Sequence, residues 1–407
     1  MMSANKKQLW SFAMFFVLYE LIIYLSNDMI MPAMLQVVAD FHAAGSDIAL
    51  SLSLYILGGS SLQIVLGPLA DHLGKRRVML AGNVLFLAAT LAIPFAATME
   101  QFLAARFFQG MGSCFIFIGY ALIHELFDDK DAVKLTTILS NTGIFAPLIG
   151  PVVGSAVVST WHWHTVFAIS LAVGGITLAG FANSMPDGKI KDTPFDFTAA
   201  RKSYGRIFGC GRFMSGILIA GLAITPLTAW IGLSPSIVMD GMHASYGTYI
   251  AWQCAIFSGF ILATFAVQKL DENFSLGRLI RVGGLLALIG MSGFGLFWQY
   301  SLVFIAGMFL FSIGFGLFNG ALIRLAMTAT GESMSLTSSA MSLFYCIIIS
   351  AGLEAYNLVG QARGFTLASY ALCNVPLGIA VYLGLLRFIR KHEDSDPARA
   401  GAQAQSA

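Results

Sequence analysis

Residues 17–32 read VLYELIIYLSNDMIMP and form the centre of an apolar segment that runs from Leu9 to Leu35. About 20 predominantly apolar residues suffice to cross a bilayer as a helix, so this segment predicts a membrane span. It is too long for the core of a secretory signal and lacks a small-residue cleavage site. We therefore expect it to be retained as the first span.

Two carboxylates, Glu20 and Asp28, lie inside this apolar segment. An ionised acid at the bilayer centre costs at least about 2.5 kcal/mol, so we expect each acid to be neutral, paired or hydrated. In a helix the two acids are roughly 12 Å apart along the axis. Tyr24 and Asn27 lie on a similar side of that helix, so all four side chains are expected to face one interior cavity.

The composition of the whole chain extends this prediction. Hydrophobic residues make up 57% of the 407 residues and charged residues only 11%, whereas soluble domains carry roughly a quarter charged residues. The sequence therefore predicts an all-α membrane protein. Polar, Gly and Pro punctuation divides it into twelve transmembrane helices, at approximately 9–36, 48–70, 78–97, 101–127, 133–158, 164–184, 212–238, 246–268, 279–298, 301–326, 335–359 and 364–387.

The basic residues predict the orientation of these spans. Of the 23 Lys and Arg residues, all but Arg106 and Arg363 fall in the termini or in loops on the same side as the termini. Basic residues concentrate on the cytoplasmic side, so both termini are expected in the cytoplasm. The net charge of +2 gives no reason to expect nucleic-acid binding. The five scattered cysteines predict neither a disulfide framework nor a metal site.

The longest polar interval, residues 185–211, separates six spans from six. This arrangement favours a duplicated transporter, although the halves show no visible identity. We expect an N-terminal six-helix bundle at 1–184, a cytoplasmic linker at 185–211, a C-terminal six-helix bundle at 212–390 and a disordered cytoplasmic tail at 391–407. Within the linker, residues 196–207 would form either a short amphipathic helix on the inner surface or a solvated connection.

The loop after the second predicted span reads GPLADHLGKRRVMLAG at residues 67–82. This pattern resembles the signature of the major facilitator superfamily (MFS). Gly67 and Gly74 would allow helix ends to approach closely, and Asp71 would cap a helix or pair with a base as a conformational latch. We therefore expect conformational roles for these three residues and for Arg76. The alternative is an ordinary inward loop that is basic for topological reasons.

The fifth predicted span contains NTGIFAPLIGPVVGS at residues 141–155. Small residues at near four-residue spacing let helices approach, and prolines add bends. The pattern also resembles a motif of the drug/proton antiporter branch of the superfamily, which generally is absent from importers. It implies conformational roles for Gly143, Pro147, Gly150, Pro151 and Gly154, whereas a plain packing face is the alternative.

The fourth predicted span carries an arginine, Arg106, in the sequence ARFFQG. This resembles the family's fourth-helix motif, in which the arginine takes part in proton coupling. Gln109, one turn further on, would hydrogen-bond it from the same face. The alternative is that Arg106 extends to the outer interface and has no role in coupling.

The first span itself is similar to that of the MdfA-type multidrug/proton antiporters, through Glu20, Tyr24, Asn27, Asp28 and Pro32. The resemblance continues in the fourth, seventh and tenth spans. It implies proton coupling by Glu20, Asp28 and Arg106. Some candidate substrate-binding residues match positions of the family, and others are aromatic or acidic side chains of other spans. The candidates are Tyr24, Asn27, Asp28, Tyr120, Trp230 and Glu354.

Acids in an apolar cavity suit antiport. Burial favours the neutral carboxylic acid, whereas an approaching cation favours the carboxylate. A proton and a cationic compound would therefore compete for the same acids. The sequence leaves open which of Glu20 and Asp28 stores the proton and which binds the substrate.

We therefore predict a proton-driven multidrug efflux antiporter of the bacterial inner membrane, acting as a monomer on small lipophilic compounds. The expected partners are these compounds, protons and the lipid bilayer, with no cofactor beyond the proton gradient. A dedicated exporter of one metabolite or siderophore, a proton-coupled importer and a membrane receptor are the alternatives. The sequence has neither a Walker motif nor an HExxH-like site, so we expect no enzyme activity.

Overall fold

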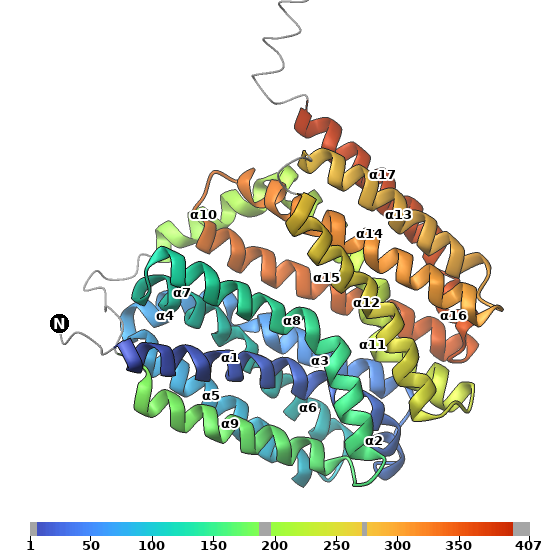
Figure 1. The fold of residues 1–407 in the computed structure, drawn as a ribbon, viewed down its shortest axis with the longest axis horizontal. Helices are drawn as coiled ribbons and strands as arrows, with labels where there is room; N and C mark the ends of the chain where they lie inside the picture. The colour runs from blue at the N-terminus through green and yellow to red at the C-terminus, as the bar shows by residue number, and fades with distance from the viewer. Residues whose placement is uncertain (1–5, 187–196, 271–274, 394–407) are drawn as a thin grey trace, which may run out of the picture. The chain divides into compact units, whose positions relative to one another are not determined.

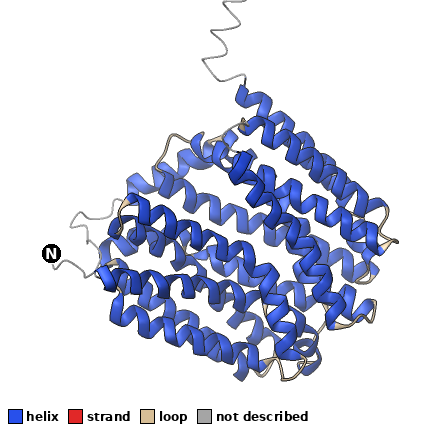
Figure 2. Ribbon diagram, viewed as in Figure 1, coloured by secondary structure: helices blue, strands red, loops and turns tan. Residues whose placement is uncertain are grey.

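A computed structural model describes residues 6–186, 197–270 and 275–393 of the chain. All regular elements of the described residues are helices, as Figure 2 shows. Their order along the chain can be followed in Figure 1 from blue to red. The elements up to the polar interval are α1 (Lys6–Asp28), η1 (Met31–Ala33), α2 (Met34–Asp40), α3 (Ser46–Ser61), α4 (Gln63–Leu73), α5 (Lys75–Ala92), η2 (Ile93–Phe95), α6 (Met99–Gly110), η3 (Met111–Phe115), α7 (Ile116–Leu126), α8 (Asp129–Val158) and α9 (His164–Ser184).

The later elements begin with a helix inside the predicted linker. They are α10 (Phe197–Gly209), α11 (Gly211–Ser234), the π-helix η4 (Pro235–Gly241), α12 (Tyr246–Leu270), α13 (Leu276–Leu296), α14 (Ser301–Thr328), α15 (Met334–Arg363), α16 (Leu367–Ala371) and α17 (Asn374–Glu393).

Eleven helical segments of the described chain are long and apolar enough to cross a membrane. The count reaches twelve when α8, bent by 49° between Asp129–Gly143 and Phe145–Val158, is included as one span. Pro147 explains the position of this bend, because a proline clashes with the carbonyl four residues earlier, here that of Gly143. The predicted all-α membrane fold is confirmed, whereas the orientation of the termini stays a prediction.

Contacts between helices group the chain into two compact units. Unit 1 comprises Met1–Arg201, Ala229–Gln253 and Ser350–Gln361, and unit 2 comprises Lys202–Thr228, Cys254–Ile349 and Ala362–Ala407. Unit 1 thus includes the first nine α-helices, the π-helix η4 and parts of α10, α11, α12 and α15. The domain boundaries drawn from sequence stay predictions, and residues 187–196 and 394–407 lie outside the described residues.

Close helix packing in unit 1 depends on glycines of α3 and α6. A Cβ on Gly58 would lie 2.0 Å from the carbonyl oxygen of Phe107, and a Cβ on Gly110 would lie 2.1 Å from that of Tyr55. The two backbones therefore touch where any larger residue would separate them. This contact brings the middle of α3 against the part of α6 that carries Arg106.

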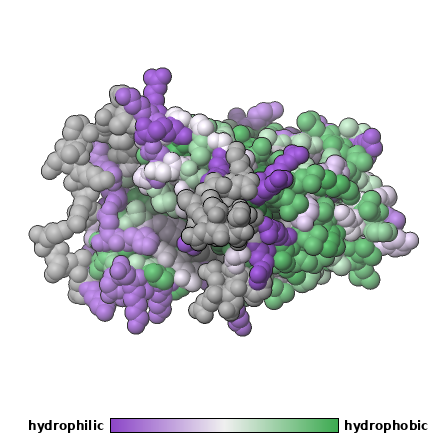
Figure 3. All heavy atoms as spheres, turned by 90° about the horizontal axis from the view of Figure 1, so that it is seen from above, coloured by the Kyte–Doolittle hydropathy of each residue, from purple (hydrophilic) through white to green (hydrophobic). Residues whose placement is uncertain are grey.

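In unit 2, α13 packs on α14 and α17. Its exposed side carries apolar residues at helical spacing, namely Val282, Leu285, Ile289 and Leu296. The face of the molecule drawn in Figure 3 has a broad hydrophobic area, and hydrophilic side chains gather elsewhere on that face. Such an area is costly in water and favourable in a bilayer.

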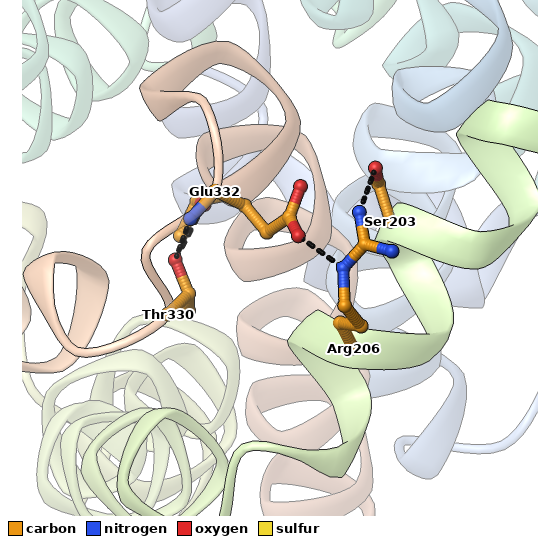
Figure 4. Close-up of polar contacts among 5 residues, drawn as sticks. Ser203, Arg206, Thr330 and Glu332 are labelled. Atoms are coloured by element: carbon orange, nitrogen blue, oxygen red, sulfur yellow. Dashed lines mark hydrogen bonds and ion pairs between the residues drawn. The ribbon is translucent and has the colours of Figure 1, made fainter.

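Polar contacts connect helix α10 to the loop between α14 and α15, as Figure 4 shows. The guanidinium of Arg206 pairs with the carboxylate of Glu332 and donates to the Ser203 hydroxyl at 3.1 Å. The Glu332 amide donates to the Thr330 hydroxyl at 3.3 Å. The pair raises the pKa of Arg206 and, through the hydrogen bond from that guanidinium, lowers the pKa of Glu332.

The other face of α10 is apolar. Ile207 is fully buried, and the ring of Phe208 lies 5.0 Å from that of Phe344 on α15. Of the two alternatives for this segment, the structure has the helix, over Phe197–Gly209, with a buried apolar face in its second half. Its place at the inner membrane surface stays a prediction.

Candidate functional site

Arg106 is fully buried at the centre of unit 1. Its guanidinium donates to the Ser51 hydroxyl at 3.2 Å, to the Gln109 amide oxygen and to the Asn27 amide oxygen at 2.6 Å. The same group stands 4.5 Å from the centroid of the Tyr55 ring, in cation–π geometry. The side chain therefore does not extend to the interface, and the expected contact with Gln109 is present.

Asn27 connects this arginine to an acid. Its amide oxygen accepts from Arg106, and its amide nitrogen donates to a carboxylate oxygen of Asp28 at 3.1 Å. Asp28 is buried, with 6% of its surface exposed. Within the described residues, Arg106 forms no ion pair with a carboxylate, and its connection to Asp28 runs through the amide of Asn27.

Glu20 occupies a different environment, although it lies two turns earlier on the same helix. One carboxylate oxygen accepts from the Tyr120 hydroxyl of α7 at 3.2 Å. The other oxygen is buried, and the Tyr24 side chain lies within hydrogen-bonding reach of the same carboxylate. The Tyr120 ring meets the Phe16 ring edge-on at 5.9 Å. The two acids of α1 are thus separately placed, one beside a phenol and one beside an amide and an arginine.

The glycines predicted from the fifth span lie against the half of α1 that bears these side chains. A Cβ on Gly150 would lie 2.3 Å from the Cβ of Asp28, and one on Gly154 would lie 2.1 Å from the backbone oxygen of Met29. A Cβ on Gly143 would lie 3.4 Å from the Tyr24 ring. The sequence predicted close packing at these glycines but did not identify the helix against which they pack. In the structure that helix is α1, at its C-terminal end. Pro147 and Pro151 lie between these glycines, inside α8.

The loop at residues 67–82 is organised around a lysine that the sequence analysis did not single out. Lys75 is buried to 6% exposure, forms an ion pair with Glu125 of α7 and lies 3.9 Å from Asp71. The spacing of Asp71 and Lys75, one helical turn, is the signal that would have indicated this pair. Glu125 is therefore part of the same charged cluster as Lys75 and Asp71.

The other predicted loop residues have separate environments. Gly74 ends α4 with a φ of 92°, which favours glycine. The guanidinium of Arg76 donates to the Ala182 carbonyl of α9 at 2.8 Å. A Cβ on Gly67 would meet nothing within 4 Å, so the close approach expected at that glycine is not observed.

Glu354 joins α15 to α3. Its carboxylate oxygens accept from the Ser53 hydroxyl at 2.5 Å and from the Asn357 amide at 2.9 Å. The same amide donates to the Ser46 carbonyl at 3.1 Å, and the Ser350 hydroxyl donates to the Ser53 carbonyl at 3.2 Å. In this conformation the predicted substrate contact is a helix-to-helix connection.

Trp230, the remaining predicted contact, is fully buried on α11. Its ring stacks on that of Trp252 of α12, with centroids 6.1 Å apart and planes 13° apart. One turn further, the Gln253 amide donates to the Ser234 hydroxyl at 2.7 Å. In the sequence, only an isolated glutamine in an apolar span indicated this polar pair.

Comparisons with known proteins identify the family of this chain. A sequence model described as Major Facilitator Superfamily matches residues 16–353. The chain belongs to the Major Facilitator Superfamily. The predicted family is therefore confirmed, and with it the prediction of a secondary transporter rather than an enzyme.

Relatives of this MFS protein include bacterial proteins named multidrug transporter MdfA. The protein of Yersinia pestis bv. Antiqua is 36% identical over 395 residues, which cover 94% of this chain and 95% of the relative. That of Escherichia coli O6:H1 is 34% identical over 359 residues, 86% of each chain. These matches, together with the spans, show a multi-span protein of the bacterial inner membrane.

Solved structures of other MFS transporters share the fold. A D-xylose–proton symporter aligns with a TM-score of 0.70 at 15% identity, over 93% of this chain and 97% of the symporter. A variant of the nucleoside transporter NupG aligns with a TM-score of 0.73 at 11% identity, over 93% of this chain and 99% of the transporter. At these identities the likeness concerns the fold alone.

Proposed function

We propose that this protein is a proton-driven antiporter that exports lipophilic cationic and neutral compounds by alternating access. Its energy source would be the proton gradient, with no cofactor. The observation that carries the proposal is the pair of buried carboxylates on α1, one of which is connected to a buried arginine through Asn27. The MdfA relatives, named multidrug transporters, support the breadth of the substrates.

Proton coupling follows from the cost of burying charge. A carboxylate in an apolar interior is stable when it is protonated or when a cation lies beside it. Asp28 has a neutral amide between it and Arg106, so its charge is only partly compensated. A cationic substrate would supply the missing charge, and its departure would leave the site to a proton.

The helix contacts give this exchange a route to conformational change. Gly150 of α8 packs against Asp28, and Gly154 packs against Met29, the residue that follows α1. Any movement of Asp28 toward a substrate therefore requires α1 and α8 to shift together, because no space separates them. The Lys75 cluster at the loop of residues 67–82 would act as the conformational latch predicted for Asp71.

The experiment measures proton release from inverted membrane vesicles after tetraphenylphosphonium is added. We expect release with the parent protein, and a loss of at least about ten-fold with Glu20→Gln or Asp28→Asn, since coupling needs a titratable acid. Glu100→Gln removes an exposed acid of α6 and is the matched control. Full proton-coupled exchange in both variants would show the site assignment to be wrong.

The same assay separates the multidrug exporter from a dedicated one. A panel of structurally unrelated lipophilic compounds should each cause release from vesicles that contain the parent protein. If only one defined metabolite did so, the chain would be a specific proton-coupled exporter. Proton uptake in place of release, in the same vesicles, would indicate import.

A further inference from the structure

Tyr55 of α3 places its aromatic ring against the guanidinium of Arg106. The guanidinium carbon lies 4.5 Å from the ring centroid, and the tyrosine is buried, with 5% of its surface exposed. Its hydroxyl donates to the Ile23 carbonyl of α1 at 2.7 Å and lies 3.5 Å from the Ser26 hydroxyl. The α3 backbone and the α1 carbonyl therefore hold the ring from opposite ends, in a fixed position beside the arginine.

The charge of Arg106 is compensated without a carboxylate. Its guanidinium donates to neutral oxygens, those of Ser51, Asn27 and Gln109, and it forms no ion pair with any acid that the structure describes. A buried charge is costly unless nearby groups stabilise it. The negative face of an aromatic ring attracts a cation most strongly where water is excluded. The Tyr55 ring therefore acts in place of a counter-ion.

The packing of α3 on α6 determines how close this ring lies to the arginine. A Cβ on Gly110 of α6 would lie 2.1 Å from the Tyr55 carbonyl oxygen. One helical turn before Tyr55, the Ser51 hydroxyl accepts from Arg106 at 3.2 Å. The helix α3 thus presents a hydroxyl and a ring to Arg106 from one face, and the close contact of the two backbones fixes their distance from it.

We propose that Tyr55 is a positioning residue, whose ring holds the Arg106 guanidinium against α3 and so keeps it out of a direct ion pair with Asp28. The inference rests on the proposed function, which it deepens by explaining how Asp28 can take up a proton near a buried cation. Without the ring, the guanidinium would gain most by turning to the carboxylate from which Asn27 now separates it. A direct pair favours the carboxylate over the acid, so Asp28 would then hold its proton only at lower pH.

The titratable groups around Asp28 come from four helices. Arg106 lies on α6, and Tyr55 and Tyr249 interact with the Asp28 carboxylate from α3 and α12. Glu20 lies two turns away on α1 itself, and α8 faces Asp28 with a glycine. Of these groups, Tyr55 touches the arginine through its ring, so replacing that ring tests the position of the guanidinium.

The experiment follows the infrared band of protonated carboxylic acids in the purified full-length protein as the pH is changed. The part of the band that is lost in Asp28→Asn reports the protonation of Asp28. In Tyr55→Leu, the midpoint of this titration should fall by about one pH unit, which is a ten-fold change in proton affinity. Tyr55→Phe keeps the ring and should keep the parental midpoint.

Tyr19 of α1 provides the matched control. It is fully buried, its hydroxyl donates to the Gly112 carbonyl at 2.9 Å, and its ring lies 5.5 Å from that of Phe181. Tyr19→Leu removes a ring of the same size and should leave the Asp28 midpoint unchanged.

Fluorinated phenylalanines at position 55 provide a second series, which keeps the proposal testable if Tyr55→Leu does not fold. Fluorine preserves the shape of the ring while it withdraws negative charge from the ring face. The Asp28 midpoint should therefore fall further with each added fluorine.

Three results would overturn the role of the ring. They are an unchanged midpoint in Tyr55→Leu and along the fluorinated series, equal shifts in Tyr55→Leu and Tyr19→Leu, and a shift in Tyr55→Phe as large as that in Tyr55→Leu. Proton release from vesicles after addition of tetraphenylphosphonium tests antiport separately. Its absence in the parent, with the infrared shift present, would refute the antiporter and leave Tyr55 as the residue that positions Arg106.

Discussion

Asn27 is central to the candidate site because it links a buried arginine to a buried acid. Its amide contacts both Arg106 and Asp28, accepting from the first at 2.6 Å and donating to the second at 3.1 Å. An amide at this position keeps the acid and the arginine connected without neutralising either. Replacement by aspartate would place a second carboxylate beside Asp28, whereas replacement by alanine would leave both groups with one partner fewer.

We expect Asn27→Ala to reduce proton-coupled export at least ten-fold. A hydrogen bond to a charged group is worth about 1.5–3 kcal/mol, and about 1.4 kcal/mol corresponds to ten-fold. Vesicle proton release with tetraphenylphosphonium measures the effect. Asn183→Ala, at an exposed asparagine of α9, makes the same chemical change elsewhere and should have no effect. Parental transport in Asn27→Ala would mean that the bridge has no role.

At the scale of helices, the packing of α8 on α1 determines where Asp28 lies. We expect Gly150→Ala to abolish transport or lower stability by about 1–3 kcal/mol, because overpacking forces the backbone to move. The added Cβ would lie 2.3 Å from that of Asp28. Gly175→Ala, on α9, adds the same methyl group where nothing lies within 4 Å. Thermal unfolding and vesicle transport should separate the two variants, and equal behaviour would refute the contact.

The helix α10 is held to unit 2 by a charge pair whose pH dependence has a definite sign. The pKa of Glu332 is lowered by Arg206, so the pair stabilises docking above the ordinary pKa of a glutamate, about 4.3. That stabilisation is lost as the pH falls through the lowered value. Arg206, whose pKa is raised, stays charged throughout. Docking of α10 should therefore weaken only in acid.

A tryptophan at Phe208, which packs beside Phe344, would report this docking. Its emission, as a difference from the parent, should shift to longer wavelength below about pH 4. Arg206→Glu should produce the shift at neutral pH, and the exchange of charges in Arg206→Glu/Glu332→Arg should reverse it. A spectrum unaffected by Arg206→Glu would show that the apolar face alone holds the helix.

Across the whole molecule, hydropathy predicted the spans because each must satisfy its backbone internally and match the bilayer. The contacts between residues of the candidate site could not be predicted from hydropathy. Arg106 and Asn27 are 79 positions apart, and no local pattern pairs them. Resemblance indicated Arg106 and Asp28 together. The amide between them, the pairing of Lys75 with Glu125 and the hydrogen bond from Gln253 to Ser234 depend on tertiary packing.

Unit 1 includes segments from both halves of the sequence. Alternating access would require some contacts between these segments to break. The Ser53 hydroxyl of α3 donates to Glu354 of α15 at 2.5 Å. A carrier that opens to each side in turn must break some contacts between its halves. We therefore expect this connection to be broken in another state of the transport cycle, and a covalent link between the two positions to stop transport.

The experiment places cysteines at Ser53 and Glu354 in a variant whose five native cysteines have been replaced. A short bifunctional thiol reagent with a reducible bond should cross-link the two helices and reduce proton-coupled export to background. Reduction should restore it to the level before cross-linking, since only the link is removed. The single-cysteine variants, treated identically, control for modification of either site. Undiminished export by the cross-linked protein would mean that α3 and α15 move as one body throughout the cycle.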